Sequence, residues 1–437
     1  MKKTVLKFGG SSLADSGQFK KVRDIILSED GKTYVVVSAP GKRSPSDTKV
    51  TDMLYSAYDA ASRGRNYSEI LENIRRRYLE IVTALEISFD LDKEISEIAK
   101  RLETDPQVDY VVSRGEYLNA RIFSAFLGFE FVEPAECVFF NADGTLNQDR
   151  TYSELNKKLE NLDHAVIAGF YGAFEDGRIH TFSRGGSDIS GSIAARAVNA
   201  DVYENWTDVS GMLSADPRIV KNPKSIETIS YRELRELSYM GASVMHEEAV
   251  FPVRAAGIPI NIRNTNRPED RGTWIVSHNS TAGSSAVTGI AGKKGFSTLL
   301  IEKAMMNNEV GFVAKLLNIF ASRGVSVEHI PTGIDTITAV VDSDGFKRSK
   351  SEILDEIKEQ LNPDTVIVES GLVLIAVVGV GMVYKKGVSA TLFTALADAD
   401  VNVRMIDQGS SEMNIIIAVD DSDYGKAVNA IYSAFFA

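Results

Sequence analysis

Short apolar segments alternate with amphipathic stretches over the first two-thirds of the chain. Segments rich in β-branched and other apolar residues predict strands at residues 4–8, 33–38, 165–169 and 200–205. Helical spacing of apolar residues predicts helices at residues 19–28, 50–61, 67–85 and 153–162. Strands that are apolar throughout are typical of parallel sheets buried on both faces. The alternation therefore predicts an α/β fold in which a mostly parallel sheet is sandwiched by helices.

The last third of the chain has a different pattern, which occurs twice. Residues 311–317 resemble residues 387–393, and residues 323–330 resemble residues 399–406, at an offset of 76 positions. The order of elements in each copy is β-α-β-β-α-β, which is typical of a ferredoxin-like α+β unit. The predicted strands are residues 295–302, 325–330, 335–342, 373–380, 401–407 and 412–419. The predicted helices are residues 311–323, 349–361, 388–397 and 421–435.

We expect three domains from these patterns. A segment rich in Ser, Thr and Gly at residues 277–285 marks the end of the first domain, which covers residues 1–285. The two ferredoxin-like units cover residues 295–368 and 369–437, and they can share the strand at 295–303. A length of 437 residues agrees with two or three domains, since one domain takes about 150 residues.

Composition and charge exclude several classes of binding partner and of protein. The net charge of −12 argues against a nucleic acid, because no surplus of basic residues exists to neutralise phosphates. The one cysteine, Cys137, excludes an intrachain disulfide and lies in an apolar segment typical of a buried side chain. No apolar run approaches the ~18 residues of a membrane span, and the N-terminus turns polar too soon for a signal peptide. We therefore expect a cytoplasmic protein.

The most informative motif lies at residues 181–192. Arg184, two adjacent glycines, Ser187 and Asp188 precede a run of small residues at 193–198, which predicts a helix with Ser187 or Asp188 as its N-cap. Glycines allow the backbone to approach a ligand, and a helix N-terminus favours an anion. The guanidinium of Arg184 suits a carboxylate or phosphate. The segment therefore predicts an anion-binding site with a fixed carboxylate beside it.

Lys7 ends the first predicted strand and is followed by Gly9, Gly10 and Ser11. A lysine and a glycine turn between a strand and a helix suit phosphate binding, although the motif is neither a Walker A loop nor a dinucleotide fingerprint. The alternative is a surface lysine before an ordinary glycine turn.

Two further motifs combine with these. Glu116 precedes a predicted helix at 117–127 and would lie in its first turn, where the helix dipole stabilises negative charge; the alternative is an ordinary N-terminal glutamate. Thr207 and Asp208 follow the strand at 200–205, and a glycine loop leads from them to Arg218. These residues suit a nucleotide, whereas the alternative for Asp208 is a turn closed by its own side chain.

The four motifs lie at residues 7–12, 113–116, 182–188 and 206–218. Together, and in this order along the chain, they resemble those of aspartate kinase, a member of the amino-acid-kinase family. The C-terminal repeat resembles the paired ACT regulatory domains of that enzyme, and the resemblance covers nearly the whole chain. It implies ATP-dependent phosphorylation of the side-chain carboxylate of L-aspartate, the first step of lysine, threonine and methionine biosynthesis. The reacting carboxylate is ionised at neutral pH, since its reference pKa is ~3.9, so catalysis needs alignment and charge neutralisation rather than a general base.

The resemblance also implies roles for individual residues. The catalytic residues would be Lys7, Arg184 and Asp188. The aspartate-binding residues would be Thr51, Glu116, Arg184 and Ser187. The ATP-binding residues would be Lys7, Gly9, Gly10, Ser11, Thr207, Asp208, Met212, Arg218 and Ser243. Mg²⁺ would arrive with the ATP phosphates, without a metal site of the protein's own. For Thr51 the alternative role is that of a helix N-cap.

The resemblance also implies regulation by an amino acid. Lysine is the first choice of effector and threonine the second. The effector-binding residues would be Met306, Ser326, Val327, Glu328 and Thr332. Glu328 could pair with the ammonium of the effector, and the alternative is a surface glutamate at a strand end. Pairing of ACT units between subunits implies a homodimer or a higher homo-oligomer.

Two departures from the family pattern leave other functions open. Ser243 stands where the family commonly has a lysine, and Met212 where it often has a tyrosine. The alternatives are another amino-acid kinase, such as one acting on glutamate, and a non-catalytic ACT sensor of amino acids with a degenerate kinase domain.

Overall fold

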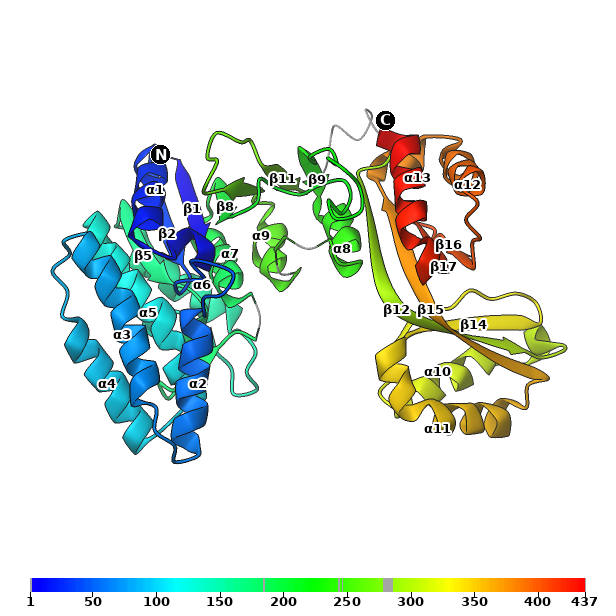
Figure 1. Cartoon of the computed structure of the whole chain (residues 1–437), viewed down its shortest axis with the longest axis horizontal. Coiled ribbons are helices and arrows are strands. Elements are labelled where there is room, and N and C mark those ends of the chain that lie inside the picture. The colour runs from blue at the N-terminus through cyan, green and yellow to red at the C-terminus, as the bar shows by residue number, and fades with distance from the viewer. Residues whose placement is uncertain (1, 184, 243, 246, 278–285, 437) are drawn as a thin grey trace. The chain divides into compact units, whose positions relative to one another are not determined.

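The computed structural model describes residues 2–183, 185–242, 244–245, 247–277 and 286–436 of the chain (Figure 1). The chain divides into two compact units. The N-terminal unit consists of Met1–Met212, Glu227–Tyr231 and Val244–Asn279. The C-terminal unit consists of Leu213–Ile226, Arg232–Ser243 and Ser280–Ala437.

The N-terminal unit is built on an eight-stranded sheet with the order β3-β5-β2-β1-β8-β10-β11-β9. Its strands are β1 (Lys3–Phe8), β2 (Lys32–Val37), β3 (Glu130–Val132), β5 (His164–Ala168), β8 (Val202–Thr207), β9 (Thr228–Ser230), β10 (Ile260–Asn264) and β11 (Thr273–Val276). All neighbouring pairs are parallel except β10 with β11. The central strands β1 and β2 are buried along almost their whole length, which explains their continuous apolar sequences. The predicted mostly parallel sheet is confirmed.

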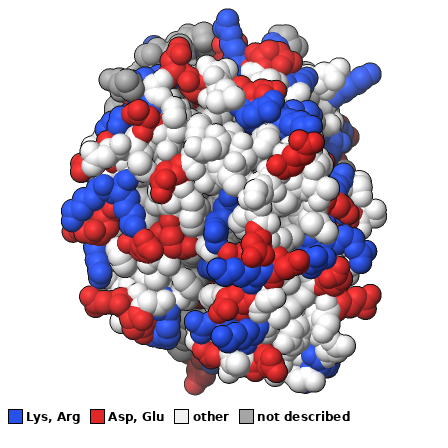
Figure 2. All heavy atoms as spheres, turned by 90° about the vertical axis from the view of Figure 1, so that its left-hand side faces the viewer, with Lys and Arg blue, Asp and Glu red and all other residues white. Residues whose placement is uncertain are grey.

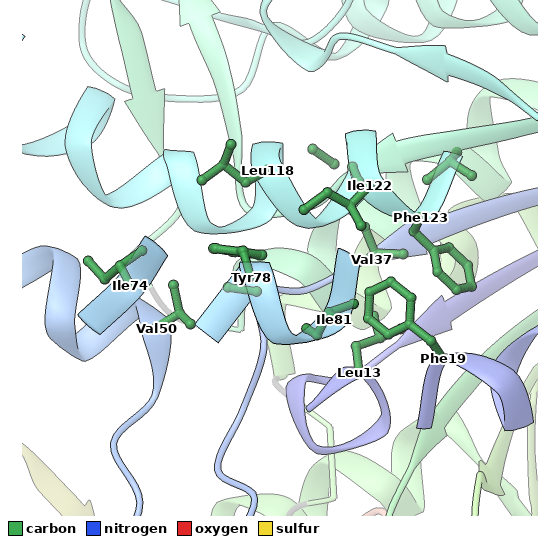
Figure 3. Close-up of a cluster of buried hydrophobic side chains, with 14 of the residues drawn as sticks. Leu13, Phe19, Val37, Val50, Ile74, Tyr78, Ile81, Leu118, Ile122 and Phe123 are labelled. Carbon is green, nitrogen blue, oxygen red and sulfur yellow. The ribbon is translucent and has the colours of Figure 1, made fainter. Parts of the chain in front are cut away.

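Helices cover this sheet. They are α1 (Ser16–Leu27), α2 (Val50–Ser62), α3 (Ser68–Ala84), α4 (Leu91–Thr104), α5 (Val108–Leu127), α6 (Gln148–Leu159), α7 (Gly186–Val198) and α9 (Phe251–Ala256), whereas α8 (Tyr231–Tyr239) belongs almost entirely to the C-terminal unit. Helix α5 packs on β2, β3 and β5, and α7 packs on β1, β2 and β8. Figure 3 shows Leu118, Ile122 and Phe123 of α5 facing side chains of α3 in the main hydrophobic core. This packing holds α5 firmly against the sheet.

Several elements of this unit differ from the sequence prediction. Helix α5 begins at Val108, nine residues before the predicted start, because residues 111–116 are buried in the core although polar residues interrupt their pattern. Helix α6 begins at Gln148 rather than at residue 153, with the side chain of Asn147 as its N-cap. A small sheet of β4 (Phe139–Phe140), β6 (Tyr171–Phe174) and β7 (Ile179–Thr181) was not predicted, since strands this short have no distinct period.

The main part of the C-terminal unit is one six-stranded antiparallel sheet with the order β13-β14-β12-β15-β17-β16. Its strands are β12 (Gly289–Glu302), β13 (Val327–His329), β14 (Thr336–Asp342), β15 (Thr365–Val378), β16 (Met405–Asp407) and β17 (Asn414–Asp420). The long strands β12 and β15 pair along their whole length and run through both halves of the unit (Figure 1). Each half therefore takes one part of β12 and one part of β15.

The two halves have separate hydrophobic cores. Helices α10 (Phe312–Ser322) and α11 (Ser343–Leu361) contribute to the first core, and α12 (Val388–Asp398) and α13 (Tyr424–Phe436) to the second. The predicted repeat of ferredoxin-like elements is confirmed, but β12 and β15 begin six and eight residues earlier than predicted. Their early parts contain polar residues that do not match an apolar strand pattern, and the pairing of the two strands determines their length.

Charged side chains of both signs lie on the surface (Figure 2). On the face shown in Figure 2, basic and acidic residues are interspersed, and no large area carries positive charge alone. Within the described ranges, no helix is both long enough and apolar enough to cross a membrane.

Candidate active site at the carboxyl ends of the parallel strands

Lys7 and Asp188 form a buried ion pair at the end of β1. The Nζ of Lys7 lies 2.5 Å from Oδ1 of Asp188, and the side chain of Lys7 is almost fully buried. The Nδ2 of Asn205 donates a hydrogen bond of 3.0 Å to the same Oδ1, and Asn205 is the β8 neighbour of Lys7 in the sheet. Asp188 is therefore held from two sides and fixes the position of the ammonium of Lys7.

Helix α7 carries Asp188 to this position. The N-cap is Gly185 in the left-handed conformation, so the prediction of Ser187 or Asp188 as N-cap is wrong. Both residues lie in the first turn instead, because the glycine reverses the chain earlier than a side-chain cap would. The buried Ser187 packs against Gly169, where a Cβ atom would lie 2.7 Å from the Ser187 hydroxyl. Arg184 lies outside the described residues.

The glycine turn after β1 packs against the loop after β2. The N–H of Gly41 donates to the carbonyl of Gly10 at 2.8 Å, and a Cβ at Gly10 would lie only 2.8 Å from the carbonyl oxygen of Ala39. The guanidinium of Arg77 donates to the carbonyl of Gly41 and forms an ion pair of 2.6 Å with Asp47. The sequence analysis missed this second loop, although the Pro40–Gly41 pair directly after a predicted parallel strand was a signal for it.

Glu116 lies on the inner face of α5. Its side chain is only 5% exposed, and burial raises its pKa to about 8, although the N–H of Ala39 and the charge of Lys7 oppose the rise. The Oε2 atom of Glu116 has no hydrogen-bond partner in the described part of the chain. The prediction that Glu116 lies in the first turn of a helix is wrong, because α5 starts eight residues earlier, at Val108. Burial, rather than a helix dipole, dominates its electrostatics.

Thr51 lies in the first turn of α2, a helix whose N-cap is Lys49. The alternative role of Thr51 as the N-cap is therefore wrong. Helix α2 packs against α5, the helix that carries Glu116.

The candidate nucleotide-binding residues lie at different places. Thr207 ends β8, and its hydroxyl donates a hydrogen bond of 3.2 Å to Asp208. Met212 is 1% exposed, and its N–H donates to the hydroxyl of Thr273. Arg218 belongs to the C-terminal unit, where its exposed side chain pairs with Asp216 at 2.6 Å. Ser243 lies outside the described residues.

Neighbouring polar residues were missed by the sequence analysis because β10 was not predicted. Asn264 ends β10 beside Thr207, and both Asn264 and Thr265 are buried. The hydroxyl of Thr265 lies 2.7 Å from that of Ser12, in the turn after β1. These contacts connect the end of β10 to the glycine turn.

The candidate effector residues lie in the first half of the C-terminal unit. Val327 and Glu328 belong to the edge strand β13, and burial raises the pKa of Glu328. Ser326 and Thr332 are exposed, whereas the side chain of Met306 lies in the hydrophobic core of this half.

The two edge strands of the C-terminal unit are connected by a hydrogen bond. Nδ1 of His329, on β13, lies 2.6 Å from Oδ2 of Asp407, on β16. The edge strand with the candidate effector residues therefore contacts the second half of the unit.

Comparisons with known proteins agree with this geometry. The amino acid kinase family matches residues 2–264, and an ACT domain matches residues 375–435. Aspartokinase 3 of Bacillus subtilis is 39% identical over 99% of this chain and 98% of its own length. The chloroplastic aspartokinase 1 of Arabidopsis thaliana is 30% identical over 99% of this chain and 80% of its own length.

A solved structure shows the same fold over the full length. The crystal structure of the aspartate kinase of Clostridium acetobutylicum, an allosteric enzyme, is 49% identical with a TM-score of 0.94. The alignment covers 99% of this chain and 100% of that chain. The chain therefore belongs to the amino acid kinase family and, within it, to the aspartokinases.

Proposed function

We propose that this protein transfers the γ-phosphoryl group of ATP to the side-chain carboxylate of L-aspartate, with residues 1–285 as its catalytic domain. The observation that carries the proposal is a buried cation whose charge acts on a buried carboxyl group with one unpartnered oxygen, within the described residues. Lys7 is fixed by Asp188, and the charge of Lys7 acts on Glu116, so the two groups share one site. Lys7 suits a phosphoryl group, and Glu116 suits the ammonium of an amino acid.

The chemistry requires positioning more than proton transfer. The carboxylate of aspartate is ionised at neutral pH, since its reference pKa is ~3.9, and it attacks the γ-phosphorus directly. Lys7 neutralises the charge that develops on the transferred group, and Asp188 holds Lys7 in place through the ion pair. Glu116 holds the substrate ammonium, while Ser187, Thr51 and Arg184 bind its carboxylates.

The nucleotide lies along the turn after β1 and the end of β8. Gly9, Gly10 and Ser11 face the phosphates, and Thr207 and Asp208 contact the nucleoside. Met212 belongs to the same unit and would contribute its backbone, whereas Arg218 and Ser243, in the C-terminal unit, stay predictions of the family resemblance. Within the described residues, no cluster of three or more His, Cys, Asp or Glu side chains is placed to hold a metal ion. Mg²⁺ would reach the site with ATP, whose phosphates would supply most of its ligands.

A substrate panel tests the proposed reaction. We expect ADP release to depend on L-aspartate, with a kcat/KM for L-glutamate at least ~100-fold lower, because one extra methylene displaces the reacting carboxylate. ADP release should be measured in a coupled assay with either amino acid or neither. A preference for glutamate, or no amino-acid-dependent ADP release at all, would refute the proposal.

Two neighbouring glycines offer a test that separates catalysis from folding. Gly9 has φ −71°, which alanine accepts, but a Cβ there would lie 3.6 Å from Nζ of Lys7, beside the phosphate position. Gly9→Ala should therefore lower kcat and leave the Tm unchanged. Gly10→Ala should lower stability by about 1–3 kcal/mol, because its Cβ would lie 2.8 Å from the Ala39 carbonyl oxygen. Thermal unfolding and ADP release should be measured for both variants. An equal decrease of Tm in Gly9→Ala and Gly10→Ala would contradict the separation of catalysis from folding.

The tandem ACT units, at residues 295–368 and 369–437, regulate the enzyme by binding an end-product amino acid, lysine in the first place. Pairing of these units between subunits gives a homodimer or a higher homo-oligomer. Glu328, whose pKa burial raises, is available to pair with the effector ammonium beside Met306, Ser326, Val327 and Thr332. An effector that prefers the less active conformation lowers activity by shifting the equilibrium between the two states.

Inhibition by lysine is expected to depend on Glu328. The lysine concentration for half-inhibition should rise at least tenfold in Glu328→Ala, because an ammonium–carboxylate pair is lost from a partly buried site. Activity without effector should not change. The assay compares lysine, threonine and their mixture, with Glu352→Ala on α11 as a control for a surface glutamate. Unchanged lysine inhibition in Glu328→Ala would remove this residue from the effector site.

A further inference from the structure

One peptide group holds two side chains of α5. The peptide between Ser38 and Ala39 follows directly after β2. Its carbonyl accepts a hydrogen bond of 2.6 Å from Nδ2 of Asn119, and its N–H acts favourably on the ionised carboxyl group of Glu116, whose pKa it lowers. Glu116 and Asn119 are three residues apart on the helix, so they lie on the same face. A single rigid peptide therefore orients both side chains.

Each of these side chains has one oxygen that no described residue satisfies. Oε2 of Glu116 and Oδ1 of Asn119 are both buried, and neither has a hydrogen-bond partner among the residues that the structure describes. Asn119 is 0% exposed. A buried acceptor without a partner costs about 1–3 kcal/mol, and most buried polar groups in native proteins are paired. Two such acceptors on one helix face indicate a position for a ligand that donates hydrogen bonds.

The kind of ligand follows from the donors that the two oxygens need. An ammonium has three N–H donors and no acceptor, so it can bond to both oxygens and offset the charge of the carboxylate. A carboxylate or phosphate has only acceptors and would be repelled. The ammonium of Lys7 is already paired with Asp188, so it does not fill this position.

We propose that Asn119 is a specificity-determining residue, whose Oδ1 accepts a hydrogen bond from the α-ammonium of the substrate alongside Oε2 of Glu116. The proposal rests on the function proposed above and names a second group for the recognition of the amino acid. Asn119 supplies an acceptor without adding another charge to a buried site, where two carboxylates would repel each other. The high pKa of Glu116 agrees with a site that becomes fully charged only when a cation enters.

Binding of two dicarboxylates distinguishes this role from a structural one. L-Aspartate and succinate differ in the ammonium, so only aspartate uses the two oxygens. In the wild-type protein, aspartate should bind at least tenfold more tightly than succinate. In Asn119→Ala, we expect the Kd for aspartate to rise about 10- to 100-fold, while the Kd for succinate and the KM for ATP stay unchanged. Isothermal titration calorimetry on the full-length protein measures both constants.

Controls on the same helix make the result decisive. Ser124→Ala removes a buried hydroxyl that donates to the carbonyl of Phe129, and it should change neither constant. Asn119→Ser keeps a smaller acceptor, and its preference for aspartate should fall between those of wild type and Asn119→Ala. If Asn119→Ala fails to fold, the Kd values of Asn119→Ser for aspartate and succinate test the proposal in its place.

Two different outcomes would overturn the proposal. Equal weakening of aspartate and succinate binding in Asn119→Ala would show that Asn119 acts only on the structure, and unchanged Kd values for both ligands in both variants would remove it from ammonium recognition. Each of these results leaves the proposed reaction intact. A wild-type protein that neither binds nor phosphorylates aspartate would instead overturn the proposed function together with this inference.

Discussion

Replacement of Lys7 by methionine is expected to lower kcat for aspartyl phosphate formation by about 10³-fold or more. Lys7 is the buried cation that Asp188 fixes at the end of β1, and methionine cannot replace its charge. The fold should persist, because methionine retains the length of the side chain and Asn205 still bonds to Asp188. The KM for aspartate should change little, since Lys7 acts mainly on the phosphoryl group in the transition state.

The measurement is ADP release in the coupled assay, together with circular dichroism to verify folding. Lys20→Met, at an exposed position of α1, is the matched control and should leave kcat unchanged. Asp188→Asn should also lower kcat, because the neutral amide no longer holds the lysine through an ion pair. A folded Lys7→Met variant with kcat within tenfold of wild type would remove Lys7 from catalysis.

Replacement of Glu116 by glutamine is expected to stabilise the protein at alkaline pH and to abolish efficient use of aspartate. In the folded protein burial raises the pKa of Glu116 to about 8, from a reference value of 4.5. Between these values the folded state binds more protons than the unfolded state, so the contribution to stability falls as pH rises. This contribution of Glu116 to stability is fully lost once pH exceeds about 8, where the carboxyl group is ionised in both the folded and the unfolded state.

The loss of stability with rising pH can be measured by comparing wild type with Glu116→Gln. Between pH 6 and 9, wild type should lose about 3 kcal/mol of unfolding free energy relative to Glu116→Gln, which has no proton to lose. Urea unfolding at both pH values measures the difference. Stability curves with the same pH dependence in both proteins would contradict a raised pKa of Glu116.

The same group should make aspartate binding depend on pH. Glu116 must be ionised to pair with the substrate ammonium, so the KM for aspartate in wild type should fall as pH rises from 6 to 8. In Glu116→Gln the KM should be about 100-fold higher and independent of pH over this range. Calorimetry in buffers of different ionisation enthalpy should detect proton release on binding to wild type only.

Local sequence determined the fold class and the order of its parts. Continuous apolar segments such as residues 33–38 can be buried only in a central strand, and the offset of 76 residues identifies a repeat without any coordinates. The motifs around Lys7, Glu116 and Asp188 predicted a site only in combination, through their resemblance to the amino-acid-kinase family.

Tertiary structure alone decided how these residues act on one another. No local pattern pairs Lys7 with Asp188, which is 181 positions away, or places Asn205 beside both. Helix propensity predicted Glu116 at a charged helix start, whereas packing extended α5 and placed this carboxyl group in the core. The two unpartnered oxygens of Glu116 and Asn119 depend on the peptide after β2, more than 75 positions earlier. Burial and long-range pairing set the electrostatics of the site, and both arise only when the chain is packed.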